Sequence, residues 1–301
     1  MSFDGISIIA TSYNSGKYLM ELVNSIYSLN IKSEFELIIV DDCSTELRTQ
    51  QVLEYLTNND KAKVIINKKN CGVQYARNLG FSAAKGKFIM LIDGDDFLNS
   101  DYHIGNKNYI DHALDVLTND DIAFVHSYSY MVGDYTGHTI TSYPLTEELI
   151  VKKHHVPTSI IYRKGDILCN NPYDTNIFKW QDWSFGIHLL NCRIKKNKKN
   201  IIYCVEGICH FYRIHNTTNR ISEREISELN MTLLTIKKNK EIFYKYFSNY
   251  LKDEELATKL LENKPSRLEE LLYISKNNFE LAKKIISERS AYLGPVFVGV
   301  P

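Results

Sequence analysis

Short apolar runs alternate with helix-like stripes along the first hundred residues. Four of these runs predict strands, at residues 6–10, 35–40, 64–66 and 88–92. Between them, apolar residues recur at helical spacing over residues 18–29, 46–56 and 73–84. Alternating strands and helices of this length predict a parallel sheet with helices on both faces. The nearly continuous apolar character of the strands fits burial on both sides.

The rest of the chain divides into a less regular middle and a helical end. Residues 122–132, 158–163 and 201–205 predict further strands, and residues 183–190 predict a helix. From about residue 222 onward only helical stripes occur. We therefore expect an α/β domain over residues 1–220, with halves 1–100 and 101–220, and a helical appendage over residues 221–301.

Composition and charge exclude several classes of protein. The 301 residues include 36 basic and 36 acidic side chains, so no net positive field would attract nucleic acid. The six cysteines are scattered without a disulfide or metal-binding spacing. No signal peptide and no apolar run long enough to cross a bilayer is visible. We expect a cytoplasmic protein whose contact with a membrane, if it has one, is peripheral.

Acidic side chains follow two of the predicted strands. Asp41 and Asp42 end one run, and Asp93, Asp95 and Asp96 end another. In an open parallel sheet, ligands bind beyond the carboxyl ends of the strands. Three carboxylates within four residues repel one another unless a cation neutralises them, and oxygen ligands suit Mg²⁺ or Mn²⁺. For Asp42, a role in capping the following turn is the more economical interpretation.

Four motifs occur in an order and spacing that resemble family 2 glycosyltransferases. They are Thr-Ser-Tyr-Asn at 11–14, Val-Asp-Asp at 40–42, Ala-Arg-Asn-Leu-Gly at 76–80 and Leu-Ile-Asp-Gly-Asp-Asp at 91–96. The resemblance is dense over the first hundred residues and looser to about residue 220. It implies the GT-A fold, a Rossmann-like α/β architecture. It also implies that residues 1–100 bind the nucleotide and that residues 101–220 bind the acceptor.

The resemblance implies roles for residues of the donor pocket. Thr11 and Tyr13 would flank the nucleobase, and Asp41 would hydrogen-bond to it, typically to uracil. Arg77 would lie near the base or the diphosphate, where its fixed charge is useful.

The acidic cluster takes the next roles in the same resemblance. Asp93 would face the ribose, and Asp95 would hold a Mn²⁺ or Mg²⁺ ion that bridges the two phosphates. For Asp96, a supporting role beside the metal and a helix cap are equally open.

A second group of residues resembles the family's acceptor side. The segment Lys-Trp-Gln-Asp-Trp at 179–183 matches the region that carries the catalytic base, which makes Asp182 the expected base. Gln181 stands where the family usually has Glu. Trp180 and Trp183 would contact the acceptor sugar or fill the core, and capping of the helix at Trp183 is a further possible role for Asp182.

A third match lies near residue 213. Arg213 and His215 resemble the family's Tyr-Arg-x-His segment, which follows a predicted strand and would approach the diphosphate from a loop containing residues 216–220.

Together these features predict an inverting glycosyltransferase that moves one sugar from a UDP-sugar to a glycan or lipid-linked saccharide, as in bacterial surface polysaccharide synthesis. The Gln-x-x-Arg-Trp motif of processive members is absent. Two alternatives remain, a glycan-binding scaffold with a relic site and a haloacid-dehalogenase-type phosphatase. The latter needs its Asp-x-Asp on the first strand rather than the fourth.

Two regions have open roles on the sequence alone. The basic run at residues 193–199 is either a lipid contact or a solvated loop. The helical appendage could dock on a membrane, form a homodimer or support the fold.

Overall fold

The computed structural model describes residues 2–215, 226–249 and 252–293. Its strands are β1 (Phe3–Ser12), β2 (Phe35–Asp41), β3 (Lys63–Ile66), β4 (Gly86–Asp93), β5 (Phe97–Leu98), β6 (His103–Ile104), β7 (Lys107–Asn108), β8 (Ile122–Gly133), β9 (Gly137–His138), β10 (Ile161–Arg163) and β11 (Ile201–Ile214). Its α-helices are α1 (Gly16–Ser28), α2 (Leu47–Asn58), α3 (Val73–Ala83), α4 (Tyr109–Val116), α5 (Glu147–Val151), α6 (Gln181–Lys195), α7 (Glu228–Lys238), α8 (Lys240–Tyr246), α9 (Asp253–Glu262), α10 (Arg267–Asn277) and α11 (Phe279–Leu293).

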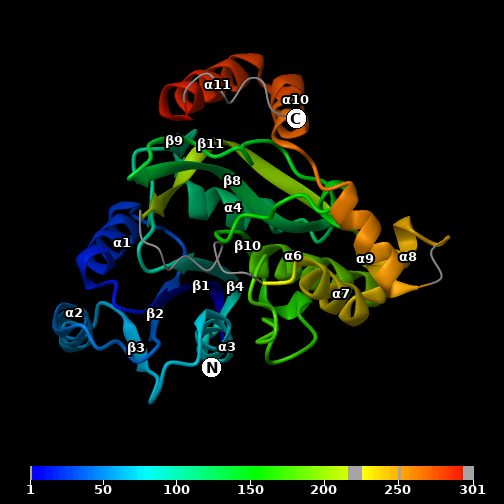
Figure 1. The fold of residues 1–301 in the computed structure, drawn as a ribbon. Coiled ribbons are helices and arrows are strands. Elements are labelled where there is room, and N and C mark those ends of the chain that lie inside the picture. Colours follow the sequence, from blue (N-terminus) through cyan, green and yellow to red (C-terminus); the bar gives the residue numbers. More distant parts are fainter. Residues whose placement is uncertain (1, 216–225, 250–251, 294–301) are drawn as a thin grey trace.

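One sheet runs through the molecule in the order β3-β2-β1-β4-β10-β8-β11-β5 (Figure 1). The first four of these strands pair in parallel, as the alternating pattern predicts. Beyond β4 the sheet is mixed, because β10 lies antiparallel to both β4 and β8 while β11 is parallel to β8. The predicted α/β fold is confirmed, and its regular parallel part coincides with the residues whose pattern was regular.

Helices cover both faces of this sheet because successive strand residues point to opposite sides. On one face, Ile9 and Leu91 pack with Ala76 of α3 and Leu189 of α6. On the other face, the neighbouring strand positions pack with helices α1, α2 and α4. The parallel strands therefore end at one protected edge, where their polar terminal residues emerge.

The strand register places those terminal residues side by side. Thr11 lies opposite Asp93 on β4, and Ser12 lies opposite Asp41 on β2. The sequence-predicted donor residues are thus brought to one edge by backbone pairing alone.

Strand β11 is longer than the predicted segment at residues 201–205 and continues to Ile214. His210 and Arg213 therefore lie within a strand that pairs with β8, rather than after a strand. The hydrophobic pattern did not predict this longer strand, because His210 is polar although it is buried inside the molecule. Residues 216–220, the loop expected to carry more of this site, lie outside the described part of the chain.

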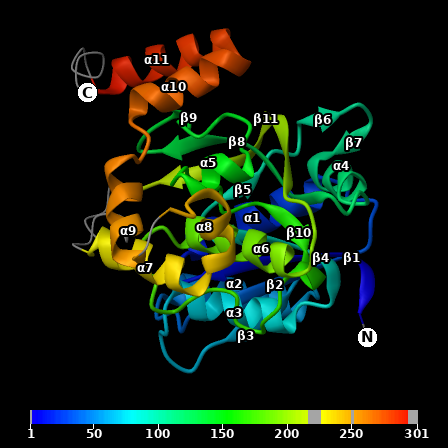
Figure 2. The same ribbon diagram turned by 90° about the vertical axis from the view of Figure 1, so that its right-hand side faces the viewer.

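The C-terminal helices α7 and α8 pack on the α/β part of the fold. Ile236 of α7 and Phe243 of α8 belong to the same apolar cluster as Leu189 of α6. Helices α10 and α11 pack on each other beyond β9 (Figure 2). The predicted boundary near residue 220 falls outside the described residues, but the core itself continues across it.

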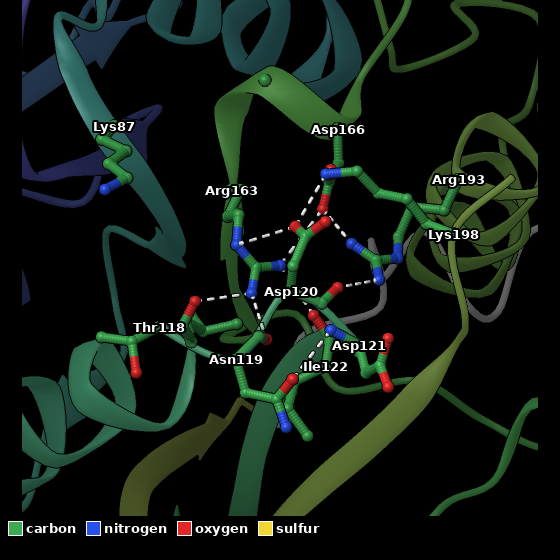
Figure 3. Close-up of polar contacts among 12 residues, drawn as sticks. Lys87, Thr118, Asn119, Asp120, Asp121, Ile122, Arg163, Asp166, Arg193 and Lys198 are labelled. Atoms are coloured by element: carbon green, nitrogen blue, oxygen red, sulfur yellow. Dashed lines mark hydrogen bonds and ion pairs between the residues drawn. The ribbon is translucent and has the colours of Figure 1, made fainter. Parts of the chain in front are cut away.

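Side chains of the basic run at residues 193–199 contact acidic residues of the protein, as Figure 3 shows for Arg193 and Lys198. Arg193 is fully buried and forms an ion pair with Asp166. Lys198 contacts both Asp166 and Asp120, at 3.0 and 2.7 Å. The remaining lysines of the run also have protein partners, namely Glu241, the Gly165 carbonyl oxygen and Asp121. The run therefore ties the end of α6 to the residues just before β8 and just after β10. Lys195 and Lys199 remain exposed, and a contact of the run with lipid stays a prediction.

Within the described residues, we find no helix that is both long and apolar enough to span a membrane.

Candidate active site

Arg77 of α3 joins the end of β4 to the start of α6. Its Nη2 lies 3.1 Å from Oδ1 of Asp93, and its Nη1 lies 2.8 Å from Oδ1 of Asp182. The hydroxyl of Thr11 donates a further hydrogen bond of 3.3 Å to the same Asp93 oxygen. Residues 11, 77, 93 and 182, far apart in the chain, therefore form one polar cluster.

The carboxylates of Asp93 and Asp182 stabilise the positive charge of Arg77. The side chain is only 2% exposed, and burial alone would lower its pKa. Asp182 and Asp93 outweigh that effect and raise the pKa above its ordinary value, so the guanidinium stays charged. Its Nε has no hydrogen-bond partner in the described part of the chain and lies near the ring of Tyr173, at 5.4 Å from guanidinium carbon to ring centroid.

Asp182 lies in the first turn of α6, where the helix dipole favours a negative charge. Trp180 is the capping residue, and it makes no side-chain cap, so the structure does not show Asp182 as the cap. The carboxylate is 22% exposed, and Oδ2 forms no hydrogen bond with any described residue. One oxygen is thus oriented by Arg77 while the other is open to solvent, which is the arrangement a general base requires.

Asp95 faces His215 across the end of the sheet. Its Oδ2 lies 2.9 Å from Nε2 of His215. Burial, together with the negative charge of Asp93, raises the pKa of Asp95, and the contact with His215 partly opposes this. A cation close to Asp95 would relieve the same cost.

Asp96 has a supporting role that the sequence left open. It is 2% exposed, accepts a 2.8 Å hydrogen bond from the backbone N–H of Arg213, and lies 3.0 Å from Nε2 of His210. Burial raises its pKa to about 6 despite the contact with His210. Asp96 therefore fixes β11 against the acidic cluster and is not a helix cap.

The carboxylate and histidine side chains of the cluster fit a metal ion only in part. Among the described residues, no group of three or more His, Cys, Asp or Glu side chains could hold a metal. Asp96 is engaged by His210 and the backbone of Arg213, and Oδ1 of Asp93 by Arg77 and Thr11, which leaves Oδ1 of Asp95 and Oδ2 of Asp93 without a partner among the described residues. Mg²⁺ is commonly held by one or two carboxylates together with substrate phosphates. The residues thus fit an ion shared with a diphosphate, but not a preformed protein cage.

The nucleobase residues show two different environments. The ring of Tyr13 is 51% exposed, as a stacking platform must be. Asp41 is buried, and its oxygens accept hydrogen bonds of 2.5 and 2.8 Å from the hydroxyl and N–H of Ser44. Asp42 accepts from Asn67 and from the N–H groups of residues 71 and 72, so it orders the loop before α3. The expected cap of the following turn is wrong for Asp42, because Asp41 accepts the hydrogen bonds of that turn. A contact of Asp41 with a base remains a prediction.

The two tryptophans separate into a core residue and a surface residue. Trp183 is 3% exposed, and its indole N–H donates a 2.7 Å hydrogen bond to the carbonyl of Ile150. The prediction of acceptor contact is thus wrong for Trp183, because its ring is enclosed by the core. Trp180 is half-buried, and its contact with an acceptor stays a prediction.

Two residues near Arg213 were missed by the sequence analysis. The Arg213 guanidinium lies 4.3 Å from the ring centroid of Tyr18 and 2.5 Å from Glu21, both on α1. The ring of Tyr18 also lies 5.0 Å from that of His215. Tyr18 fitted the apolar stripe of α1, and only the return of β11 shows that its ring supports the site.

Comparisons with known proteins agree with this geometry. Residues 7–158 match the family described as Glycosyl transferase family 2. Poly(ribitol-phosphate) beta-N-acetylglucosaminyltransferase TarS of Staphylococcus aureus is 39% identical over 114 residues, which are 37% of this chain and 20% of TarS. The putative teichuronic acid biosynthesis glycosyltransferase TuaG of Bacillus subtilis is 28% identical over 52% of this chain and 55% of its own length. The matched region thus spans about a fifth of TarS.

Solved structures show the same fold. The crystal structure of S. aureus TarS 1–349 in complex with UDP-GlcNAc superposes with a TM-score of 0.62 at 20% identity, covering 96% of this chain and 92% of that one.

Proposed function

This chain belongs to glycosyltransferase family 2, and on that premise we propose that it is an inverting enzyme that transfers one sugar from a UDP-sugar to a glycan acceptor. The observation that carries the proposal is the Arg77 bridge. It fixes Asp93, at the end of the nucleotide-binding strands, and Asp182, at the start of α6, to one guanidinium. Donor-side and base-side carboxylates are therefore held at a fixed separation, as direct displacement requires.

In the proposed reaction, Oδ2 of Asp182 accepts the proton of an acceptor hydroxyl. The hydroxyl oxygen forms a bond to the anomeric carbon, and the bond from that carbon to the phosphate oxygen breaks. UDP leaves with the electron pair, so an α-linked donor gives a β-linked product. Arg77 orients Asp182 before the acceptor arrives.

The donor pocket in this proposal lies over the ends of β1, β2 and β4. Tyr13 would offer its exposed ring to the base, and Asp93, at the end of β4, would face the ribose. Asp95 and His215 would hold Mn²⁺ or Mg²⁺ together with the diphosphate, and the ion would neutralise the charge of the departing UDP. Arg213 supports this side by donating to the backbone carbonyl of Asp95 at 2.8 Å.

For the sugar and the acceptor, the names of the relatives support a proposal. TarS is named as a transferase of N-acetylglucosamine to poly(ribitol phosphate), and TuaG is named for teichuronic acid synthesis. We infer a hexose or N-acetylhexosamine as the transferred sugar and a surface polysaccharide as the acceptor.

Calorimetry of UDP-, GDP- and dTDP-sugars with and without Mn²⁺ tests the donor assignment. We expect a UDP-sugar to bind most tightly, with Mn²⁺ strengthening that binding, and stabilisation against heat to follow occupancy. Absence of binding by every UDP-sugar would overturn the donor assignment. A nucleotide that binds with Mn²⁺ but is never hydrolysed or transferred would favour a non-catalytic protein, and steady phosphate release from phosphomonoesters would favour a phosphatase.

A further inference from the structure

Lys153 is enclosed by the two tryptophans beside the candidate base. Its ammonium nitrogen lies 3.6 Å from the ring centroid of Trp180 and 3.3 Å from that of Trp183, and the residue is 5% exposed. It forms no ion pair or side-chain hydrogen bond within the described residues. A buried ammonium ion without a carboxylate is costly, and contacts with aromatic rings offset only part of that cost.

A second unpaired cation reaches the same ring from the C-terminal region. Lys264, between α9 and α10, is exposed, and its ammonium group lies 4.7 Å from the ring centroid of Trp180. No described carboxylate forms an ion pair with it. Two other cations nearby differ in this respect, since Lys179 pairs with Glu228 at 2.7 Å and Arg267 pairs with Glu270 at 3.0 Å.

The charge of Lys264 acts on Lys153. Burial lowers the pKa of Lys153 well below its ordinary value, and the charge of Lys264 lowers it further, whereas Glu228 opposes the shift. Two cations that repel each other beside one indole leave a local excess of positive charge. An anion bound there would remove both the repulsion and the unpaired charge.

The backbone at this place is strained. Lys153 has φ +76° and Trp180 has φ +59°, in the left-handed region that side chains other than glycine rarely adopt. Backbone strain of this kind clusters at functional sites. Two contacting residues in this region therefore point to selection for the position of their side chains.

The lysine pair is close to the acceptor side of the reaction. Trp180 precedes Asp182 by two residues, at the start of α6. His155 is within electrostatic reach both of Asp182 and of the lysine pair. It faces solvent, yet desolvation by its neighbours lowers its pKa, Asp182 opposes this, and Arg267, Lys153 and Lys264 reinforce it.

We propose that Lys153 and Lys264 bind a negatively charged group of the acceptor, a phosphate diester or a carboxylate, next to the hydroxyl that Asp182 deprotonates. This inference rests on the proposed function, because it names the acceptor class of the same site. It gives the C-terminal helices a direct role, since Lys264 comes from them, and it makes Trp180 the contact for the acceptor's sugar or polyol.

Binding of model acceptors in the presence of UDP and Mn²⁺ tests this proposal. The probes are an oligo(glycerol phosphate), an oligogalacturonate and a neutral dextran oligomer of similar length. Tryptophan fluorescence is a suitable signal, because the chain has two tryptophans and both contact Lys153. We expect at least one anionic probe to bind at least tenfold more tightly than dextran, with the advantage lost at high salt. The two anionic probes show whether phosphate or carboxylate is preferred.

Three variants separate binding from folding. Lys264→Gln should weaken binding of the anionic probe about tenfold, whereas Lys259→Gln, on exposed α9, should leave it unchanged. Lys153→Met should weaken binding more strongly and at the same time raise the melting temperature, because it replaces a buried unpaired charge with an apolar chain of similar length. Loss of stability in Lys153→Met without loss of probe binding would show a purely structural lysine.

The outcomes also distinguish this inference from the proposed function. If UDP binds but dextran binds as well as both anionic probes, the anionic acceptor is wrong and the donor assignment stands. If Lys264→Gln weakens UDP instead of the probes, the lysine pair belongs to the donor site. If no UDP-sugar binds at all, the proposed function itself fails.

Discussion

In the donor half of the site, Asp93, Asp95 and Asp96 each have a nitrogen partner within about 3 Å, supplied by Arg77, His215 and His210. In the acceptor half, Lys153 and Lys264 have no anionic partner among the described residues. The carboxylates of the first region thus have protein partners before any ligand binds, whereas the lysines of the second have none. A region whose groups are partnered holds its geometry on its own, and a region of unpartnered charge selects a ligand of the opposite charge.

Arg77 connects the two regions, and its removal gives the largest expected effect. Arg77→Met leaves Asp93 and Asp182 without their shared cation, so we expect the free energy of unfolding to fall by about 4 kcal/mol, as for other buried pairs that lose one partner. Transfer should be lost together with stability. Urea denaturation measures the change, and Arg77→Lys, which retains the charge but not the two-pronged contact, should lie between. Unchanged stability would show that the two halves are independent.

Asp182→Asn tests the acceptor half alone. The amide retains the shape but cannot accept the proton, so we expect the transfer rate to fall by about a thousandfold. Affinity for the UDP-sugar, measured by calorimetry, should change little because the donor half is intact. Transfer at the native rate would exclude Asp182 as the base.

The donor half could be predicted from the sequence because it is built from local motifs. Strand ends carry Thr11, Asp41 and Asp93, and the register of parallel strands brings them together. The contact between Arg77 and Asp182 could not be predicted, because 105 residues separate them in the chain and only the fold brings α3 and the start of α6 together.

The acceptor half could not be predicted because no single segment encodes it. Trp180, Lys153 and Lys264 come from the start of α6, the turn after α5 and the turn after α9. A sequence pattern likewise cannot distinguish Trp183 from Trp180, since their difference lies in which indole the core encloses. The role of the basic run at residues 193–199 was left open by the sequence for a related reason, because its aspartate partners are distant in the chain.

Asp95→Ala tests the metal assignment in the donor half. Asp95 is buried beside Asp93 and keeps one oxygen without a partner among the described residues, so we expect the variant to lose the part of UDP affinity that depends on Mn²⁺, about thirtyfold or ~2 kcal/mol. Titration of UDP with and without Mn²⁺ measures this difference. Asp96→Asn is the matched control, since Asp96 is engaged by β11, and it should retain the metal effect. If Mn²⁺ strengthens UDP binding equally in Asp95→Ala, another residue holds the ion.

The smallest expected effect separates the two tryptophans. Trp183→Phe removes the hydrogen bond to the Ile150 carbonyl and leaves a gap in the core, so we expect a loss of about 2 kcal/mol in unfolding free energy. Trp180→Phe keeps a ring at a half-buried position and should cost less than about 1 kcal/mol of stability, while it weakens the contacts with Lys153 and Lys264. Thermal denaturation should therefore show the larger loss of stability in Trp183→Phe, and binding of the anionic acceptor probe should be weaker in Trp180→Phe. If Trp183→Phe weakened probe binding more than Trp180→Phe did, the acceptor would reach into the core, and the division between a structural and a ligand-binding indole would not hold.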